Sequence, residues 1–352
     1  MKEQVVSVAA PRTAAVGACP LCGSTTCSLM FRAPDRLHGV SGEFTYRRCG
    51  NCKTVFQDPR VITEDLSLCY PGEYFTHQSP DESSTTPQTD LRLRAMLRQA
   101  VIGAVRQAPM SGAIGWLGRL LAKSRRLRER AFYGVIDEMM PFKPGAGRAL
   151  EAGCGAGQLL KALGQVGWQV EGLEWDEKAA EIASRMSGRQ VMVGDFQKAS
   201  LPFAAYDLVV LHHVLEHLPD TMGCLRKIED ILAPGGRAVL VYPHIESLGA
   251  RVFREDWFPW EVPRHLVLPT AMAVEKAAGA IGLVTKSLKS SARGAQGFIA
   301  LSRRYRKREP INPHTVSITF PDRLFALYER ALMSMGFELG EELVIVLEKP
   351  HL

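Results

Sequence analysis

A glycine-rich turn between two apolar segments constrains what this chain can fold into more than any other feature. Residues 151–157 read EAGCGAG, follow a short apolar segment and precede a helix-like run at 158–163. A strand, a tight turn and a helix in this order can hold a nucleotide-like cofactor by the backbone of the turn. A Cβ atom at Gly153, Gly155 or Gly157 would push such a ligand away from the main chain.

The spacing of the glycines separates two kinds of cofactor. A dinucleotide site has the spacing G-x-G-x-x-G, in which the third glycine faces a pyrophosphate. Here that position is Gln158, and the glycines run G-x-G-x-G after the acid Glu151. A carboxylate at the strand end favours a ligand with an ammonium or sulfonium group and repels a pyrophosphate. We therefore predict S-adenosylmethionine (SAM) rather than NAD; the alternative is a glycine-rich turn that is only structural.

The elements that follow predict the fold class. Apolar runs alternate with helix-like segments, which is typical of parallel strands joined by helices. The run at 206–214 is almost wholly apolar, as expected for a strand that is covered on both faces. We predict an α/β fold with a doubly wound (Rossmann-like), mostly parallel sheet of seven strands, near 148–150, 170–173, 190–195, 206–214, 237–242, 284–289 and 340–349.

Acids and histidines stand at the predicted carboxyl ends of these strands. Glu174 ends the second strand about 20 residues after the turn, where a ribose-binding acid is expected. Asp195 ends the third strand, and His212 and His213 end the fourth. Ligands of open α/β sheets bind at this edge, so these residues are candidate contacts of a cofactor or of its reaction partner.

The chain resembles the class I SAM-dependent methyltransferases. The matching segments occur in the family's order: EAGCGAG (151–157), GLEWD (172–176), GDF (194–196), HHVLEHLPD (212–220) and LAPGGRAVLVYP (232–243). The resemblance implies that Glu151 and the turn amides hold the methionine end of SAM, and that Glu174 accepts from the ribose hydroxyls. It further implies that Asp195 accepts from the adenine amino group and that Phe196 lies beside the ring. His212, at the end of the fourth strand, is either a candidate base or packs under the cofactor.

Two CxxC pairs near the amino terminus predict a metal site. Cys19 and Cys22 form one pair, Cys49 and Cys52 the other, with 26 residues between them. Four thiolates in two such pairs are typical of a structural zinc ion. The alternatives are disulfides or buried free thiols. We find no convincing secretory signal, so we expect a cytoplasmic, reducing location in which disulfides do not persist.

This amino-terminal part is similar to the zinc ribbon that precedes many bacterial methyltransferases of small-molecule and glycan biosynthesis. The similar segments are CPLCG, RRCGNCKTVFQDPR and YPGEYF, together with DWFPWEVPRHL later in the chain. The resemblance implies an acceptor among sugars, lipids, quinone precursors and other metabolites. It specifies the reaction more closely than the acceptor.

Composition and charge suggest the domain boundaries. We predict a disordered tail at 1–18, a zinc-ribbon domain at 19–77, a linker at 78–90, a basic helical cap at 91–140, and a SAM-binding domain at 141–352 with a lid insert near 292–338. The net charge of +6 is concentrated partly in 91–130, where apolar residues recur at helical spacing. Such a segment either covers the catalytic domain with a solvated face or contacts an anionic membrane peripherally.

Methyl transfer needs a general base only when the acceptor must lose a proton. Histidine is suited to this role because it titrates near neutral pH. His213 is our first candidate and His244, after the fifth strand, is our second. The alternative is that these histidines are structural. Trp257, Phe258 and Trp260 either wall the acceptor pocket or belong to the core.

Three functions remain at this stage. The first is SAM-dependent methyl transfer to a small-molecule, glycan or lipid-linked acceptor. The second is RNA methylation, in which the ribbon and the basic helices grip phosphates; it is disfavoured because the ribbon lacks stacking aromatics. The third is a non-catalytic SAM-binding or zinc scaffold protein, against which the acids at the strand ends argue.

Overall fold

The computed structural model describes residues 10–70, 88–105, 112–124, 127, 131, 135–142, 147–311, 313 and 316–351. The chain divides into two compact units. Unit 1 comprises Met1–Phe75, Leu211–Asp230 and Leu240–Leu352, and unit 2 comprises Thr76–Val210 and Ile231–Val239. Of the predicted linker, residues 78–87 lie outside the described part of the chain.

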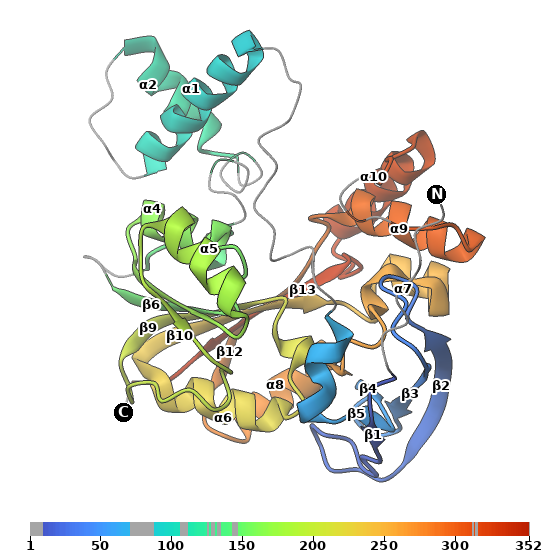
Figure 1. The fold of residues 1–352 in the computed structure, drawn as a ribbon. Coiled ribbons are helices and arrows are strands. Elements are labelled where there is room, and N and C mark those ends of the chain that lie inside the picture. The colour runs from blue at the N-terminus through green and yellow to red at the C-terminus, as the bar shows by residue number, and fades with distance from the viewer. Residues whose placement is uncertain are drawn as a thin grey trace. The chain divides into compact units, whose positions relative to one another are not determined.

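A seven-stranded sheet confirms the predicted α/β fold (Figure 1). Its order is β12-β13-β10-β9-β6-β7-β8. Strands β6, β7 and β8 pair in parallel, whereas β12 and β13 are antiparallel. The bounds are Arg148–Ala152 (β6), Gln169–Glu174 (β7), Val191–Val193 (β8), Tyr206–His212 (β9), Leu232–Pro243 (β10), Val284–Ser291 (β12) and Glu342–Glu348 (β13).

In unit 2, two helices pack on the parallel strands. Helix α4 (Gln158–Val166) packs on β7, and α5 (Glu177–Ser187) packs on β7, β8 and α4. Asp176 caps α5, because its carboxylate accepts from the backbone N–H of Ala179 at 2.8 Å. These contacts fix the turn before α4 and the carboxyl end of β7, where the cofactor site is predicted.

The predicted basic cap contains a pair of helices, α1 (Gln88–Val105) and α2 (Gly112–Leu121). They pack closely at Gly118, where an added Cβ would lie 2.4 Å from the carbonyl oxygen of Ala100. Several of the arginines on which the membrane alternative depends lie outside the described residues. Peripheral membrane contact through 91–130 therefore stays a prediction.

In unit 1, the amino-terminal segment forms a four-stranded sheet of order β11-β4-β3-β2. Its strands are β2 (Cys27–Pro34), β3 (Glu43–Cys49), β4 (Val55–Gln57) and β11 (Val267–Leu268). Strand β11 is more than 200 residues from β4 in the sequence, yet Val267 pairs with Phe56. The sheet is completed by a segment outside the predicted zinc-ribbon domain.

A short strand also lies where we expected a disordered tail. β1 (Thr13–Ala14) pairs with β5 (Arg60–Val61). Arg12 adds a bidentate ion pair with Asp65, at 2.9 and 2.7 Å. Disorder is therefore wrong for this part of the predicted tail, because the backbone and Arg12 both find partners.

The remaining helices of unit 1 include the two of the predicted lid insert, α9 (Ala295–Lys307) and α10 (Phe320–Ser334). A capping box between Thr319 and Asp322 begins α10. The other α-helices are α6 (Thr221–Ile231), α7 (Leu248–Phe253) and α8 (Ala271–Gly279), of which α6 ends at the unit boundary. Unit 1 also contains the 3₁₀ turns η1 (Thr63–Cys69), η4 (Leu215–His217), η5 (Arg254–Asp256) and η6 (Phe258–Trp260). Unit 2 contains the 3₁₀ turn η3 (Asp137–Met139). Among the described helices, none combines the length and apolarity that a bilayer crossing requires.

Candidate functional sites in the two units

The predicted cofactor site in unit 2 centres on two buried carboxylates. Glu151, near the end of β6, is 3% exposed, and its Oε2 atom has no hydrogen-bond partner among the described residues. Burial, and then the charge of Glu174, raise the pKa of Glu151 well above its usual range. A buried acceptor without a donor costs free energy, so this oxygen is suited to a ligand that donates, such as an ammonium group.

Glu174 holds the glycine turn in place. Its Oε2 atom accepts from the backbone N–H of Gly155 at 2.8 Å, and its Oε1 atom accepts from the N–H groups of Trp175 and Asp176 at 2.9 and 3.1 Å. Gly153 donates to the carbonyl oxygen of Leu173 at 2.7 Å. The carboxyl end of β7 therefore positions the turn, while the Oε2 atom of Glu174 keeps capacity for a further donor.

Gly157 has a packing requirement in addition to its predicted role at the cofactor, which stays a prediction. An added Cβ would lie 2.7 Å from the Cα of Ala183 on α5, and the residue has a φ of 82°. Close packing of the two helices and a left-handed backbone therefore account for this glycine without a ligand. Gly153 and Gly155 also have positive φ, at 69° and 50°, and they form the turn itself.

Asp195 and Phe196 follow β8. Asp195 Oδ1 accepts from the backbone N–H of Gln197 at 2.8 Å, and Lys198 Nζ lies 3.8 Å from Oδ2. The Asp195 side chain is 37% exposed, whereas Phe196 is buried. A partly open carboxylate beside a buried ring is compatible with the predicted adenine contacts.

In unit 1, His213 lies between two buried carboxylates. Its Nδ1 atom is 3.2 Å from Glu216 Oε1, and its Nε2 atom is 2.8 Å from Glu342 Oε1. Burial opposes the imidazolium form, but the hydrogen bonds to both acids prevail and raise the pKa of His213 to about 10. His213 is therefore charged at neutral pH, which does not favour our first choice of base.

His212 and His244 are also engaged. The Nε2 atom of His212 contacts a guanidinium nitrogen of Arg293, and burial places the pKa of His212 well below its usual range. His244 is buried, and its Nδ1 atom is 3.0 Å from the carbonyl oxygen of Gly340. Burial lowers the pKa of His244 as well. This environment is that of a structural histidine.

Two other histidines form a neutral pair beside Glu216. His265 Nδ1 is 2.7 Å from the carbonyl oxygen of Pro259, and His217 Nδ1 is 3.1 Å from that of Arg264. Because a carbonyl oxygen only accepts, each Nδ1 carries the proton and each Nε2 keeps a lone pair. The rings meet edge to face, with centroids 4.6 Å apart.

Burial sets the protonation of this pair. It lowers the pKa of both His217 and His265 to about 4, so both rings are neutral at pH 7. Glu216 stays ionised, because His213 outweighs the effect of burial and lowers its pKa. The Oε2 atom of Glu216 is buried without a hydrogen-bond partner among the described residues. Tyr70 completes the group, with its hydroxyl 2.9 Å from His217 Nδ1.

The aromatic residues of the DWFPWEVPRHL segment belong to the core. Trp257, Phe258 and Trp260 are each no more than 3% exposed. Trp257 Nε1 donates to Glu341 Oε2 at 2.5 Å, and Trp260 Nε1 donates to the carbonyl oxygen of Arg254 at 2.7 Å. Their indole donors are satisfied inside the protein, so the core alternative describes them.

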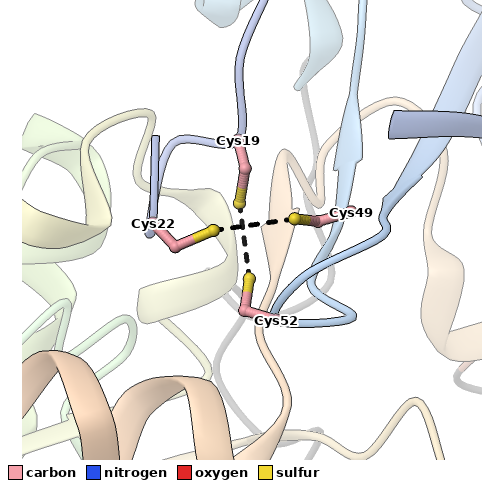
Figure 2. Close-up of side chains that lie close together, drawn as sticks. All are labelled: Cys19, Cys22, Cys49 and Cys52. Atoms are coloured by element: carbon pink, nitrogen blue, oxygen red, sulfur yellow. Dashed lines mark hydrogen bonds between the residues drawn. The ribbon is translucent and has the colours of Figure 1, made fainter. Parts of the chain in front are cut away.

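The four cysteines of the CxxC pairs converge on one point (Figure 2). The Sγ atoms of Cys19 and Cys52 are 3.5 Å apart, and those of Cys22 and Cys49 are 3.6 Å apart. Sulfurs about 2.3 Å from a tetrahedral zinc ion are separated by roughly 3.8 Å. None of the four forms a disulfide. The donor set and its spacing therefore fit zinc.

Comparison with known proteins bears on the middle of the chain. Residues 124–288 match the family model described as a methyltransferase domain. The chain carries a class I SAM-dependent methyltransferase domain. The matched residues include the glycine turn and the acids Glu151, Glu174 and Asp195.

Curated relatives of the methyltransferase domain match it over part of their length. A ubiquinone biosynthesis O-methyltransferase of Nitrosospira multiformis is 32% identical over 96 residues, which are 25% of this chain and 39% of the relative. A probable SAM-dependent methyltransferase of Mycolicibacterium smegmatis is 35% identical over 101 residues, 28% of this chain and 39% of the relative. The chain thus spans about two fifths of the length of these relatives.

Among solved structures, a SAM-dependent methyltransferase from Mesorhizobium loti aligns with a TM-score of 0.42 and 16% identity, over 65% of this chain and 99% of its own. A similarity of this size supports no argument about function.

Three residues that contact the histidines of unit 1 were not predicted as site residues: Tyr70, Arg293 and Glu342. Glu342 did leave a signal, since it directly precedes the apolar run 343–347, where an ionised group needs a partner. Tyr70 and Arg293 left none, because their partners His217 and His212 are distant in the sequence.

Proposed function

We propose that this chain transfers the methyl group of SAM to a small-molecule, glycan or lipid-linked acceptor. The observation that carries the proposal is the buried, unpartnered Oε2 atom of Glu151 beside the glycine turn of the methyltransferase domain. A structural turn alone gives no reason to bury an acceptor without a donor. A cationic ligand that donates to this oxygen would explain why the acceptor is buried.

The residues of unit 2 fit SAM in the following way. Glu151 would accept from the amino group of the methionine end, Glu174 from the ribose hydroxyls, and Asp195 from the adenine amino group, with Phe196 beside the ring. When bound, SAM supplies an activated methyl group, so the protein mainly has to orient the acceptor. Glu174 also fixes the turn through Gly155, and it therefore positions the site as well as lining it.

We propose that His217, rather than His213 or His244, is the histidine of unit 1 that can take up a proton. His217 is neutral at pH 7, the residue is half-buried, and its Nε2 atom has a lone pair. The ionised carboxylate of Glu216 would stabilise the imidazolium that forms. Tyr70 and the carbonyl oxygen of Arg264 hold the ring at Nδ1, so Nε2 is the proton-accepting atom.

We propose a structural zinc ion at Cys19, Cys22, Cys49 and Cys52. The four sulfurs complete its coordination, which leaves no position for a substrate. Thr270, just after β11, donates from its hydroxyl to the carbonyl oxygen of Cys52 at 3.0 Å. The zinc site would therefore stabilise the segment that carries Arg264 and His265 as well as the ribbon.

The acceptor class is proposed from chemistry. Two curated relatives have methyltransferase names, and one of these names is that of an O-methyltransferase. A base is needed when a hydroxyl is methylated, because its proton must leave. The neutral histidine pair beside Glu216 would meet that need, so we favour a hydroxyl acceptor.

Incubation of the purified chain with methyl-labelled SAM and a metabolite extract of the host tests the proposal. We expect label in a small organic molecule, and loss of this labelling in Glu151→Gln. The matched control is Glu181→Gln, an exposed acid of α5 whose partner is Arg185, which should label as the wild type does. If no binding of SAM is detected even at millimolar-range SAM, the proposal is wrong.

A further inference from the structure

Helix α10 of unit 1 shows an apolar face to solvent. Its exposed side chains include Phe320, Leu324, Leu327 and Tyr328, and Met335 and Phe337 continue the face beyond the helix; all six are between 54% and 76% exposed. We call these six residues the α10 apolar face. Positions 320, 324, 327 and 328 lie on one side of an α-helix. A contiguous exposed patch of this kind marks an interaction site.

The opposite side of α10 is polar where a core-facing side is usually apolar. Asp322 and Glu329 are buried there, with Ala326 between them. Arg303 of α9 forms a bidentate ion pair with Asp322, at 3.0 Å for both contacts. Burial, followed by the charge of Glu341, raises the pKa of Glu329 to about 8. The helix thus buries both of its acids and leaves the side with Phe320, Leu324, Leu327 and Tyr328 exposed, while Phe325 packs against the core.

The charges around the α10 apolar face are basic. The acids of α10 are Asp322 and Glu329, both buried, whereas Arg323 is exposed and forms no ion pair within the described residues. The contact between Arg303 and Asp322 places the basic end of α9 beside the first turn of α10, as Figure 1 shows for the two helices. That end carries Arg304, Arg306, Lys307 and Arg308.

Some of this basic charge is compensated. Arg304 is 3.8 Å from Glu309, and Arg306 and Arg308 share Asp256 at 3.8 and 3.7 Å. Arg36 contacts the same carboxylate at 2.6 Å, so three guanidinium groups surround one acid. Glu338, next to Phe337, accepts from the backbone N–H of Ser290. Arg323 and Lys307 have no ion pair among the described residues, so the surface beside the α10 apolar face keeps an excess of positive charge.

We propose that the α10 apolar face docks on an anionic lipid surface, with its apolar side chains at the boundary between headgroups and acyl chains. Apolar side chains flanked by arginines are the features by which a helix lies in a membrane interface. A second copy of the chain is a poorer occupant. A two-fold contact through this face would cover Arg323 of both copies, and α10 has no exposed acid to pair with them. This inference goes beyond the proposed function and does not depend on it.

Vesicle flotation of the full chain tests the proposal. We expect binding to phosphatidylcholine vesicles with about 25% phosphatidylglycerol, weak binding to pure phosphatidylcholine, and a decrease with salt. Leu327→Glu should weaken binding at least about tenfold. The matched control is Met272→Glu on α8, since Leu327 and Met272 are 62% and 61% exposed. It should bind as the wild type does.

Further variants separate folding from binding. Circular dichroism should show that Leu327→Glu is folded, because the side chain is exposed. Arg323→Gln, which leaves the apolar residues unchanged, should reduce binding to anionic vesicles only. The proposal is overturned if the wild type fails to float at low salt, or if Leu327→Glu floats equally well. It is also overturned if the wild type is a dimer that Leu327→Glu converts to a monomer.

Discussion

Arg264 donates hydrogen bonds to both carboxylate oxygens of Asp35, a residue 229 positions earlier in the chain. Nη1 donates to Oδ2 and Nη2 donates to Oδ1, both at 2.9 Å, and neither side chain is exposed. Although burial acts to raise the pKa of Asp35, Arg264 prevails and holds it below its usual range. The pair joins the amino-terminal segment to the segment that carries His265.

Breaking this pair should destabilise unit 1 strongly. We expect Arg264→Ala to cost about 3–5 kcal/mol, because it leaves the charge of Asp35 buried without its partner. Arg12→Ala is the control: it removes a guanidinium from a pair of similar geometry, but Arg12 is 70% exposed. That substitution should cost much less, because water screens an exposed ion pair. Chemical denaturation measures both, and equal losses would contradict the prediction.

The pH dependence of stability should report His213. Its pKa is about 10 in the folded protein and near 6.5 when unfolded. The folded state therefore binds the proton more tightly, so the stabilisation is complete below about pH 6.5 and is lost as pH rises through 10. His213→Gln should cost about 2–4 kcal/mol at pH 6 and much less at pH 10.5. A pH-independent difference between variant and wild type would refute this assignment.

Proton release should accompany SAM binding. Glu151 has a raised pKa because it is buried beside Glu174, and an ammonium ligand would favour its ionised form. We expect SAM to bind more tightly as pH rises, and titration calorimetry in buffers of different ionisation enthalpy to detect released protons. Glu151→Gln should weaken binding by about 10- to 100-fold and abolish the release. Glu181→Gln should retain both.

Zinc content should follow the four clustered cysteines alone. We expect one zinc ion per chain by metal analysis, and its loss in Cys49→Ser together with a lower melting temperature. Cys27→Ser is the control, because Cys27 lies nearby but its Sγ atom contacts the carbonyl oxygen of Ser24 at 3.5 Å. A full zinc content in Cys49→Ser would rule out the site.

The proposed base can be separated from the other histidines by rate. His217→Asn should slow formation of labelled product by about 10²- to 10⁴-fold and leave the affinity for SAM unchanged. His244→Asn, at a buried histidine held by Gly340, should slow it less than tenfold once the folded fraction is accounted for. If the two variants are equally slow, His217 is not the base.

Local sequence determined the sheet and the glycine turn. The strand at 206–212 and the helix at 158–166 agree with the predictions to within a few residues, because both follow from the apolar pattern and the turn chemistry of neighbouring residues. The paired spacing of Cys19, Cys22, Cys49 and Cys52 likewise predicted their convergence. The strand, the helix and each CxxC pair depend on residues close together in the chain.

Only the tertiary structure decided which histidine is charged and which is neutral. His213 and His217 are four positions apart and equivalent in the sequence, yet Glu342 and Glu216 raise the pKa of one while burial lowers that of the other. The tertiary structure also shows that Gly157 has no room for a Cβ atom, because Ala183 packs against it. It likewise shows that the apolar face of α10 is exposed, whereas the sequence pattern alone would place that face inward. A protonation state and a buried face depend on neighbours brought together by folding, and local periodicity does not specify those neighbours.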